Sequence, residues 1–310
     1  MITMVSVNAY NLYGSTDPDQ QARFRRLEAL IRDIDADVVA VQEVVARDPE
    51  QPSGKSKAEA AARAVRHLAD AVDRHCDAEG APVLALGGGI HHTALLWRAG
   101  IEVVPGTVGR FQRDNAGMWH SLVTAVFDLG GTKVRVGSVQ LSPFDQAWGW
   151  SDANQILRAM HRDGIPGLLG GDFNGIGAQQ VATGDGDRWY DLNPYIYHGK
   201  FAIPWHPDHA YQFDDKGELD RRVARRLENV GRMRDCALIT DTPWQATTGH
   251  HPADQHPRRR IDRWYATHHL PDNAVKAIRV LGQDQVGAST DHLPVEVDLD
   301  TDAVAAATAS

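Results

Sequence analysis

Cysteine is nearly absent from this chain of 310 residues, which contains only Cys76 and Cys236. The two lie far apart and form neither a metal-binding nor a redox pair, because such sites need closely spaced cysteines. We therefore expect two buried free thiols and a reducing compartment, for which the cytoplasm is the default.

Long apolar runs are also missing. No stretch approaches the about 20 apolar residues of a membrane-spanning helix, so we expect no membrane span. The first residues, MITMVSVN, lack the basic segment, apolar core and small-residue cleavage site of a secretion signal. We expect them to form a strand, because they are rich in β-branched residues.

Positive charge is not in excess: 32 Lys and Arg face 41 Asp and Glu, for a formal net charge of −9. Non-specific affinity for nucleic acid comes mainly from Lys and Arg that neutralise phosphates. The charge argues against a protein that depends on such affinity, but it is compatible with a local basic cleft or a divalent cation. Two basic clusters, residues 221–226 and 258–260, are expected to be solvated faces of a helix and a strand.

The sequence does contain many short strand-like segments interrupted by a few helical ones. Residues 19–34 place Phe24, Leu27, Leu30, Ile31 and Ile34 on one helical face. A pair of glycines between two strand-like segments, Gly130 and Gly131, predicts a β-hairpin. Further helices are expected at residues 57–74, 146–162 and 218–230, and strands at 1–8, 36–44, 81–89, 91–98, 101–106, 119–129, 132–142, 164–174, 258–267 and 292–299.

This alternation predicts a mixed α+β sandwich rather than a purely parallel sheet. No internal repeat or linker divides the chain, so we expect a single domain over residues 1–300. Residues 48–56 are expected to form a loop, and the alanine-rich residues 301–310 a frayed tail.

Several of the expected strands end in polar residues. Asn8 ends the first and Glu43 the second, and Asp172 and Asn174 end a later one within GLLGGDFNGIG. A strand end can hold a side chain rigidly at the rim of a fold, although Asp, Asn and Gly also fit an ordinary turn. Carboxylate and amide oxygens suit a hard cation such as Mg²⁺ or Mn²⁺, whereas the Cys and His spacing of a zinc site is missing.

A second polar group involves Asp291 and His292, which precede the last expected strand, and Asp262 in the segment RRRID. A carboxylate beside a histidine holds the ring in one tautomer and stabilises its charged form. Taken alone, Asp291 and His292 also fit a turn.

Five motifs appear in this order along the chain: VSVN, VQEV, GDFN, RIDRWY and STDHLPV, from Val5 to Val295. The ordered set resembles the endonuclease/exonuclease/phosphatase superfamily, the metal-dependent fold of pancreatic deoxyribonuclease and the abasic-site endonucleases, and GDFN is its most specific piece. The resemblance implies a four-layer sandwich of two packed mixed β-sheets flanked by helices, with the site at one edge.

The resemblance implies a metal site. Glu43 matches the metal-binding Glu of the family, and Asn8 matches an Asn that helps to position metal and phosphate. Asp291 matches an Asp that supports the metal, which would be Mg²⁺ or Mn²⁺.

The resemblance also implies catalytic roles. Asp172 matches the Asp that orients or activates the attacking water, and Asn174 matches a phosphate-binding Asn. His292 matches a general acid/base or phosphate-stabilising His, with Asp262 as its carboxylate partner. Together they imply in-line attack of water on phosphorus.

The chain departs from the family at two positions. Many members carry a His on a central strand where this chain has Gln140, whose amide cannot transfer a proton but can bind a phosphate oxygen. Tyr10 stands where many nucleases have Asp or Asn, which favours a single metal. His91, His92 and His120 are candidates to replace the missing His, although histidines in strands near aromatic residues are more often structural.

Three functions are compatible with these features. The first is a metal-dependent phosphodiesterase acting on nucleic acid, an endonuclease or exonuclease. The second, favoured by the acidic net charge, is a phosphatase or phosphodiesterase for a small or lipid-like phosphate. The third is a non-catalytic member that uses the fold for binding, for which Gln140 is the sole support.

An aromatic segment bears on the choice of substrate. Residues 183–213 either line a pocket and stack bases or form a small core beneath a long loop. The aromatic residues concerned are Trp189, Tyr190, Tyr195, Tyr197, Trp205 and Tyr211.

Overall fold

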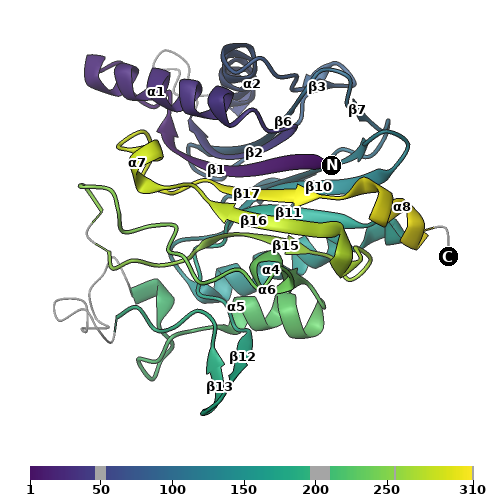
Figure 1. Ribbon diagram of the computed structural model, residues 1–310. Helices are drawn as coiled ribbons and strands as arrows, with labels where there is room; N and C mark the ends of the chain where they lie inside the picture. Colours follow the sequence, from purple (N-terminus) through teal and green to yellow (C-terminus); the bar gives the residue numbers. More distant parts are fainter. Residues whose placement is uncertain (46–53, 196–209, 255, 309–310) are drawn as a thin grey trace.

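A computed structural model describes residues 1–45, 54–195, 210–254 and 256–308, which form two β-sheets packed face to face between layers of helices (Figure 1). The predicted four-layer sandwich is confirmed. The first sheet consists, in spatial order, of β16 (Val275–Val280), β17 (Val295–Leu299), β1 (Ile2–Leu12), β2 (Val38–Val45), β6 (His91–Trp97) and β5 (Leu84–Leu86).

The second sheet lies beneath the first. Its spatial order is β14 (Arg234–Asp235), β15 (Asp262–Ala266), β11 (Gly167–Asp172), β10 (Lys133–Gln140), β9 (Ser121–Asp128) and β7 (Glu102–Val103), with β8 (Gly109–Phe111) also paired to β9. Both sheets are mixed, because β1 runs parallel to β2 and β10 parallel to β11, while other pairs are antiparallel. The hairpin predicted at Gly130 and Gly131 joins β9 to β10.

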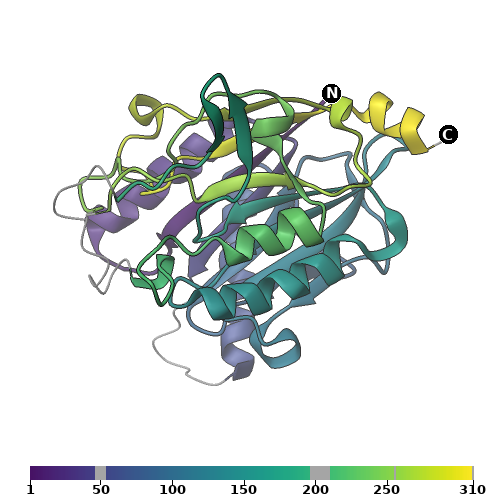
Figure 2. The ribbon, with the colours of Figure 1, turned by 90° about the horizontal axis from the view of Figure 1, so that it is seen from below.

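Helices cover the outer faces of both sheets. Helices α1 (Pro18–Ile34) and α2 (Gly54–Ala71) cover the first sheet, and α4 (Gln146–Met160) lies over the second beside α5 (Arg222–Arg225) and the π-helical turn η3 (Arg226–Val230), as Figure 2 shows. Helix α1 starts at the Asp17 cap, whose carboxylate accepts from two backbone N–H groups. Its predicted apolar face is buried, with Ile34 at the margin.

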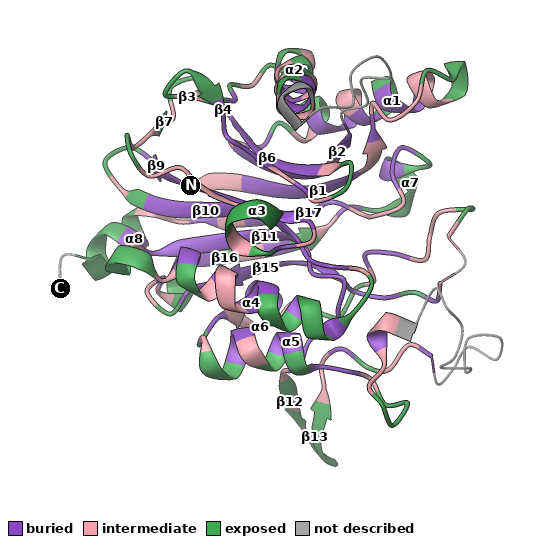
Figure 3. Ribbon diagram, turned by 180° about the vertical axis from the view of Figure 1, so that it is seen from behind, coloured by how far each residue is buried: buried purple, intermediate pink, exposed green. Residues whose placement is uncertain are grey.

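Three apolar layers result, and Figure 3 shows them as buried ribbon between exposed outer faces. The middle layer, between the sheets, contains Met4, Leu95, Phe127 and Trp264. Strand β1 contributes Met4 to this layer and its neighbour Val5 to the layer under α1 and α2, because successive strand residues point to opposite faces.

Shorter elements complete the described chain. They are β3 (Asp77–Ala78), β4 (Ala81–Pro82), α3 (Arg113–Ala116), η1 (Arg162–Gly164), β12 (Gln180–Thr183), β13 (Gly186–Trp189), η2 (Ala210–Gln212), α6 (Cys236–Ile239), η4 (Asp272–Ala274), α7 (Gln283–Val286) and α8 (Thr301–Thr308).

Several local predictions were wrong. Helix α2 begins at Gly54, inside the expected loop at 48–56, whose residues 48–53 lie outside the described part. The helix expected from residue 218 begins at Arg222, because Glu218 is held in a turn by the Asp214 carboxylate. The tail expected to be frayed is helical at residues 301–308, since Val304 is buried against the middle layer.

Both cysteines are free and buried, as predicted. Among the described residues, no helix combines the length and apolar character needed to cross a bilayer.

The glycines of β11 allow close packing on both sides of this strand. A Cβ at Gly170 would lie 2.7 Å from the Trp264 ring, and one at Gly171 would lie 2.0 Å from the Val139 carbonyl oxygen. Only a residue without a side chain fits between these neighbours. The strand that carries Asp172 therefore depends on glycine immediately before it.

We expect Gly171→Ala to lower the free energy of unfolding by on the order of 3 kcal/mol, because the new methyl group must displace the backbone of β10. Urea denaturation measures the change. Gly184→Ala is the matched control, since a Cβ there meets nothing within 4 Å. Equal midpoints for the two variants would contradict the packing argument.

Candidate active site

Glu43 reaches the site through a break in the pairing of β1 with β2. Asn8 pairs with Gln42 but Leu12 pairs with Val44, so β1 bulges between these points. Glu43 itself has a φ of 59°, in the left-handed region that residues other than glycine rarely adopt. Such strain costs about 1–3 kcal/mol and is characteristic of functional sites.

The Glu43 carboxylate is held by three N–H donors. The side-chain amides of Asn8 and Gln140 donate to Oε1 at 3.2 and 2.8 Å, and the backbone N–H of Asn11 donates to Oε2 at 3.1 Å. Asn11 lies in the bulge, with a φ of 55°. The bulge therefore both exposes the carboxylate to the site and supplies one of its hydrogen bonds.

His91 lies beside Glu43, with its Nε2 3.9 Å from Oε2 of the carboxylate and 2.8 Å from Oδ1 of Asn11. Burial alone would raise the pKa of Glu43, but the positive potential of His91 and His292 and the hydrogen bonds lower it. Of the three histidines left open by the sequence, His91 and His120 line the site, whereas the His92 ring accepts from the Gly87 backbone in the interior.

Asp172 comes from the second sheet and faces Glu43 across the sandwich edge. Its Oδ1 accepts from the Asn174 backbone N–H at 2.9 Å, and its Oδ2 accepts from the Asn8 amide at 3.2 Å. Burial raises the pKa of Asp172 to about 7, with His292 opposing the shift and Asp262 adding to it. Its carboxylate thus has the proton affinity of a base that works near neutrality.

His292 and Asp262 form the predicted pair. The His292 Nδ1 lies 2.9 Å from both carboxylate oxygens of Asp262. Burial would lower the pKa of His292, but the charges of Asp262 and Asp291 and the hydrogen bond from the ring to Asp262 raise it well above its ordinary value. An opposite charge at this distance favours the imidazolium form of the ring.

Thr290 attaches this loop to the first sheet. Its hydroxyl donates to the Asn8 carbonyl at 2.6 Å and accepts from the His292 backbone N–H at 3.3 Å. These two hydrogen bonds join β1, at Asn8, to the loop that precedes β17.

Asp291 lies on the other side of His292, with Oδ1 4.0 Å from the ring Nε2. This oxygen is buried and has no hydrogen-bond partner among the described residues. Burial raises the pKa of Asp291 to about 6, and the negative charge of Glu43 contributes to the shift. An unpartnered carboxylate oxygen near a second carboxylate fits a divalent cation. The cation would be a partner for the Asp291 oxygen and would be attracted by the negative charges of both Asp291 and Glu43.

Asp172, Asp262 and His292 also place one ligand atom each within 4.8 Å of one another and could hold a metal ion. Both oxygens of Asp262, however, already bind the His292 ring. The oxygen donors of Glu43 and Asp291 are therefore the better ligands for a hard cation. Asn8, predicted as a third ligand, directs its amide nitrogen to the carboxylates, and its Oδ1 accepts from the Tyr10 N–H at 3.1 Å.

Two predicted phosphate ligands are engaged within the protein. Strand β11 ends at Asp172, and Asn174 has a φ of 48° beyond it, with its Nδ2 donating to the Leu141 carbonyl at 2.9 Å. An amide has two N–H bonds, so the second one of Asn174 can still reach a phosphate. Gln140 donates to Glu43, and its Oε1 is buried without a partner among the described residues.

Two hollows meet at this centre. They share Asn174, His292, Pro143 and Phe144 in their walls. The first hollow is further lined by Glu43, Gly89, Ile90, His91, Trp119, His120, Gln140 and Asp172. The second is further lined by Tyr10, Tyr211, His251, Ala253, Asp254, His256, Arg259, Ile261 and Asp291.

The prediction that both basic clusters are solvated faces was wrong for three of their arginines, whereas Arg222, Arg225 and Arg258 are exposed as predicted. Arg221, Arg259 and Arg260 are buried. The Arg260 guanidinium donates to the Asp235 carboxylate at 2.8 Å, and Arg259 donates to the Tyr211 hydroxyl at 3.2 Å. Their charges are used inside the protein, because partner groups distant in sequence surround them.

The aromatic segment is divided between both expected roles. Tyr195 is buried and donates to Gln212, the Trp189 ring lies under Arg221, and Tyr190 donates to the Thr242 carbonyl. Tyr211 lines the second hollow. Tyr197 and Trp205 lie outside the described residues.

Carboxylates that attract a cation, beside an imidazolium and amides that bind phosphoryl oxygens, define an enzyme that hydrolyses phosphate esters. The sequence pattern of the Endonuclease/Exonuclease/phosphatase family matches residues 9–292, and the chain belongs to this family. It is thus a hydrolase acting on phosphate esters, as the motif order predicted. No curated protein matches the chain significantly.

Solved structures show the same fold at low identity. The mannosyl-6-phosphatase Bt3783 of Bacteroides thetaiotaomicron is 13% identical, with 97% of this chain and 100% of that chain covered and a TM-score of 0.60. Truncated TDP2 of Caenorhabditis elegans is 14% identical, with 96% and 97% covered and a TM-score of 0.56. A family member from Bacteroides vulgatus is 15% identical, with 96% and 98% covered and a TM-score of 0.60.

We expect Asp262→Asn to lower the pKa of His292, because the neutral amide no longer stabilises the imidazolium. The alkaline limb of the profile of kcat/KM against pH should then move to lower pH by at least about one unit. Asp254→Asn is the control. The Asp254 carboxylate lines the second hollow, as His292 does, but it accepts from the backbone N–H groups of Gly249 and His256 instead of binding the ring. An unchanged profile in Asp262→Asn would contradict the assigned pair.

Proposed function

We propose that the protein is a phosphodiesterase that depends on Mg²⁺ or Mn²⁺ and cleaves single-stranded nucleic acid. The observation that carries the proposal is the pair of hollows meeting at Asn174 and His292. A phosphodiester has a substituent on each side of phosphorus, and each hollow can receive one of them. A phosphomonoester would need only one.

An aromatic surface in the first hollow favours nucleotides as the substituents. The Trp119 ring stacks on Trp148, with centroids 5.0 Å apart, and meets Phe144 edge-on at 5.1 Å. Phe144 is 60% exposed and Trp148 46% exposed, and the Arg113 guanidinium lies over the Trp119 ring. Exposed aromatic rings beside a cation bind unstacked bases, which supports single strands over duplexes.

The chemistry needs a cation that the site can bind through Glu43 and Asp291. Such a cation supplies positive charge to the phosphoryl oxygens and to the leaving group. The Glu43 carboxylate is kept ionised for this purpose by its lowered pKa and by its N–H donors.

The remaining side chains have separate tasks. The imidazolium of His292 donates a hydrogen bond to a phosphoryl oxygen, which gains negative charge during attack. The second N–H of Asn174 can bind another oxygen. Asp172 accepts the proton of the attacking water, for which its raised pKa suits it.

A phosphatase for a small phosphate is the second candidate. Its support is the formal net charge of −9, which opposes the approach of a polyanion. A phosphodiesterase needs the second hollow to receive a substituent of the phosphate, whereas a phosphatase does not.

A substrate screen separates them. The protein, with EDTA or with Mg²⁺ or Mn²⁺, is given single-stranded DNA, RNA, duplex DNA, a chromogenic bis-ester and a set of phosphomonoesters. We expect metal-dependent cleavage of single strands and of the bis-ester, reduced at least about 1,000-fold in Glu43→Gln and Asp172→Asn. Faster hydrolysis of monoesters than of any diester would overturn the proposal in favour of the second candidate.

We expect Phe144→Ala to raise the KM for a single-stranded oligonucleotide roughly 5- to 100-fold, because a base loses the exposed ring on which it stacks. Hydrolysis of the bis-ester should stay the same, since the catalytic centre is intact. Trp150→Ala is the matched control: this exposed tryptophan of α4 lies outside both hollows, under the Arg226 guanidinium. A similar loss in both variants would count against base stacking.

A further inference from the structure

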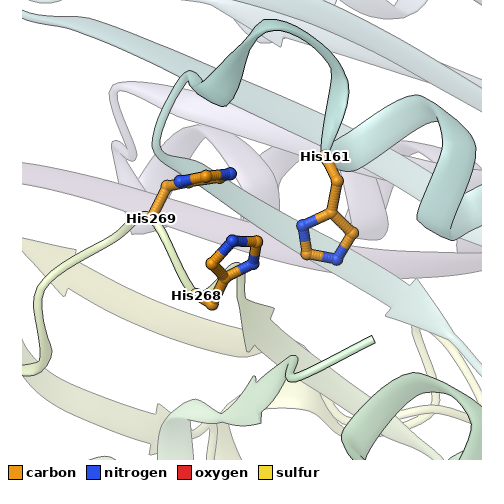
Figure 4. A group of neighbouring side chains, drawn as sticks. All are labelled: His161, His268 and His269. Atoms are coloured by element: carbon orange, nitrogen blue, oxygen red, sulfur yellow. The ribbon is translucent and has the colours of Figure 1, made fainter. Parts of the chain in front are cut away.

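Three histidines lie together at the opposite end of the second sheet. His161 caps the end of α4, and His268 and His269 follow β15. Each offers one ring nitrogen, and these atoms lie within 4.8 Å of one another. Figure 4 shows the three rings gathered around a common space, one from the helix end and two from the loop.

This cluster is separate from the phosphoesterase centre. Strand β15 begins at Asp262 in that centre and ends at Ala266 beside the cluster. At about 3.3 Å per residue, the two sites are about 15–20 Å apart. Strand β11 connects the same two ends, since Gly167 donates to the Thr267 hydroxyl and Asp172 pairs with Asp262.

The backbone that carries the histidines is fixed on both sides. The Leu270 N–H donates to the Thr267 carbonyl at 3.0 Å, so His268 and His269 occupy the middle of a tight turn. Arg234 donates to the Thr267 carbonyl at 2.7 Å and also binds the Leu270 carbonyl. On the other side, the His161 N–H is bonded to the Leu157 carbonyl.

The His161 side chain is half-buried, and the surroundings of its ring favour a ligand. Both of its ring nitrogens are buried, and neither has a hydrogen-bond partner of good geometry among the described residues. The Gly231 backbone lies close enough to affect the ring, and burial with the neighbouring histidines lowers the pKa of His161 to about 4. A neutral ring with one nitrogen near a backbone carbonyl and the other free is the usual state of a metal-bound histidine.

We propose that His161, His268 and His269 form a binding site for a divalent transition metal, with Zn²⁺ as the preferred ion. Three imidazoles with a fourth position open to solvent are a known zinc ligand set. With Zn–N bonds of about 2.1 Å, the ligand atoms of a tetrahedral site lie about 3.4 Å apart. The ring nitrogens here lie within 4.8 Å of one another, so the rings must move slightly closer. His268 is exposed and can rotate to do so.

The charges around the cluster select the kind of ion. Burial and the neighbouring His269 lower the pKa of His268, and the guanidinium groups of Arg232 and Arg234 lie close enough to add to this shift. They repel any cation, and the cluster itself contributes no carboxylate. Mg²⁺ and Ca²⁺ need oxygen ligands and are disfavoured, whereas Zn²⁺ binds neutral imidazole strongly enough to offset the repulsion. The bound ion would tie the end of α4 to the turn after β15.

The test uses the whole protein, freed of metal and then kept in excess Mg²⁺ to supply the carboxylate centre. Co²⁺ is titrated as a coloured substitute for Zn²⁺, and the bound metal is counted after desalting. We expect one equivalent of Co²⁺ with the visible absorption of a nitrogen-ligated, four- or five-coordinate ion, displaced by Zn²⁺. We also expect Zn²⁺ to raise the Tm, because it binds the folded state.

The variant His268→Gln/His269→Gln changes two residues at the surface and should fold normally. We expect it to bind one equivalent less metal, or to bind it at least about 100-fold more weakly, with the Zn²⁺-dependent rise in Tm lost. His161→Gln should give the same result, and His67→Gln, at an exposed histidine of α2, should behave as wild type.

Hydrolysis of the bis-ester in Mg²⁺ should be unchanged in the double variant. An equal metal content and an identical Co²⁺ spectrum in wild type and double variant would overturn the proposal.

Discussion

The side-chain amide of Asn8 is the contact on which the site depends. It donates to Glu43, from the first sheet, and to Asp172, from the second, at 3.2 Å each. Two carboxylates brought close together repel each other unless a donor or a cation lies between them. The amide therefore sets the spacing of the two sheets at the edge where the chemistry takes place, and Thr290 in turn holds the Asn8 backbone.

Buried guanidinium groups support the loop that follows Asp172. Arg263 donates to the Gly175 carbonyl at 3.1 Å, and Arg221 binds the Gly177 carbonyl. Asp191 lies near both Arg260 and Arg263. Removing one partner of such a buried pair costs about 3–5 kcal/mol. Much of the positive charge near the site is therefore structural, and Arg259 is the arginine that lines the second hollow.

The two proposed metal sites lie at opposite ends of the second sheet and differ in the chemistry of their ligands. The centre at the ends of β1, β2 and β11 offers oxygen atoms and negative charge, which suit a hard cation. The cluster after β15 offers neutral nitrogen atoms among guanidinium groups, which suit a softer one. Both ends use residues at or near strand termini, where a rigid sheet can hold side chains that the core would exclude.

The sequence alone determined the family and the layered fold, and it predicted which residues meet at the candidate site. Glu43 and Asp172 end strand-like segments and His292 precedes one, within motifs of a recognisable order. The apolar periodicity of α1 and the glycine hairpin are local signals. Their meaning does not depend on distant residues, because periodicity and turn chemistry act within a few positions.

The tertiary structure decided the rest. Asn11 and His91 join Glu43 through a β-bulge, which needs the pairing of two strands and leaves little trace in either sequence. Arg260 of the second basic cluster is buried because Asp191 and Asp235 come to it from elsewhere in the chain. The zinc spacing missing from the sequence arises when His161 meets His268 and His269, since spatial neighbours far apart along the chain are created only by folding.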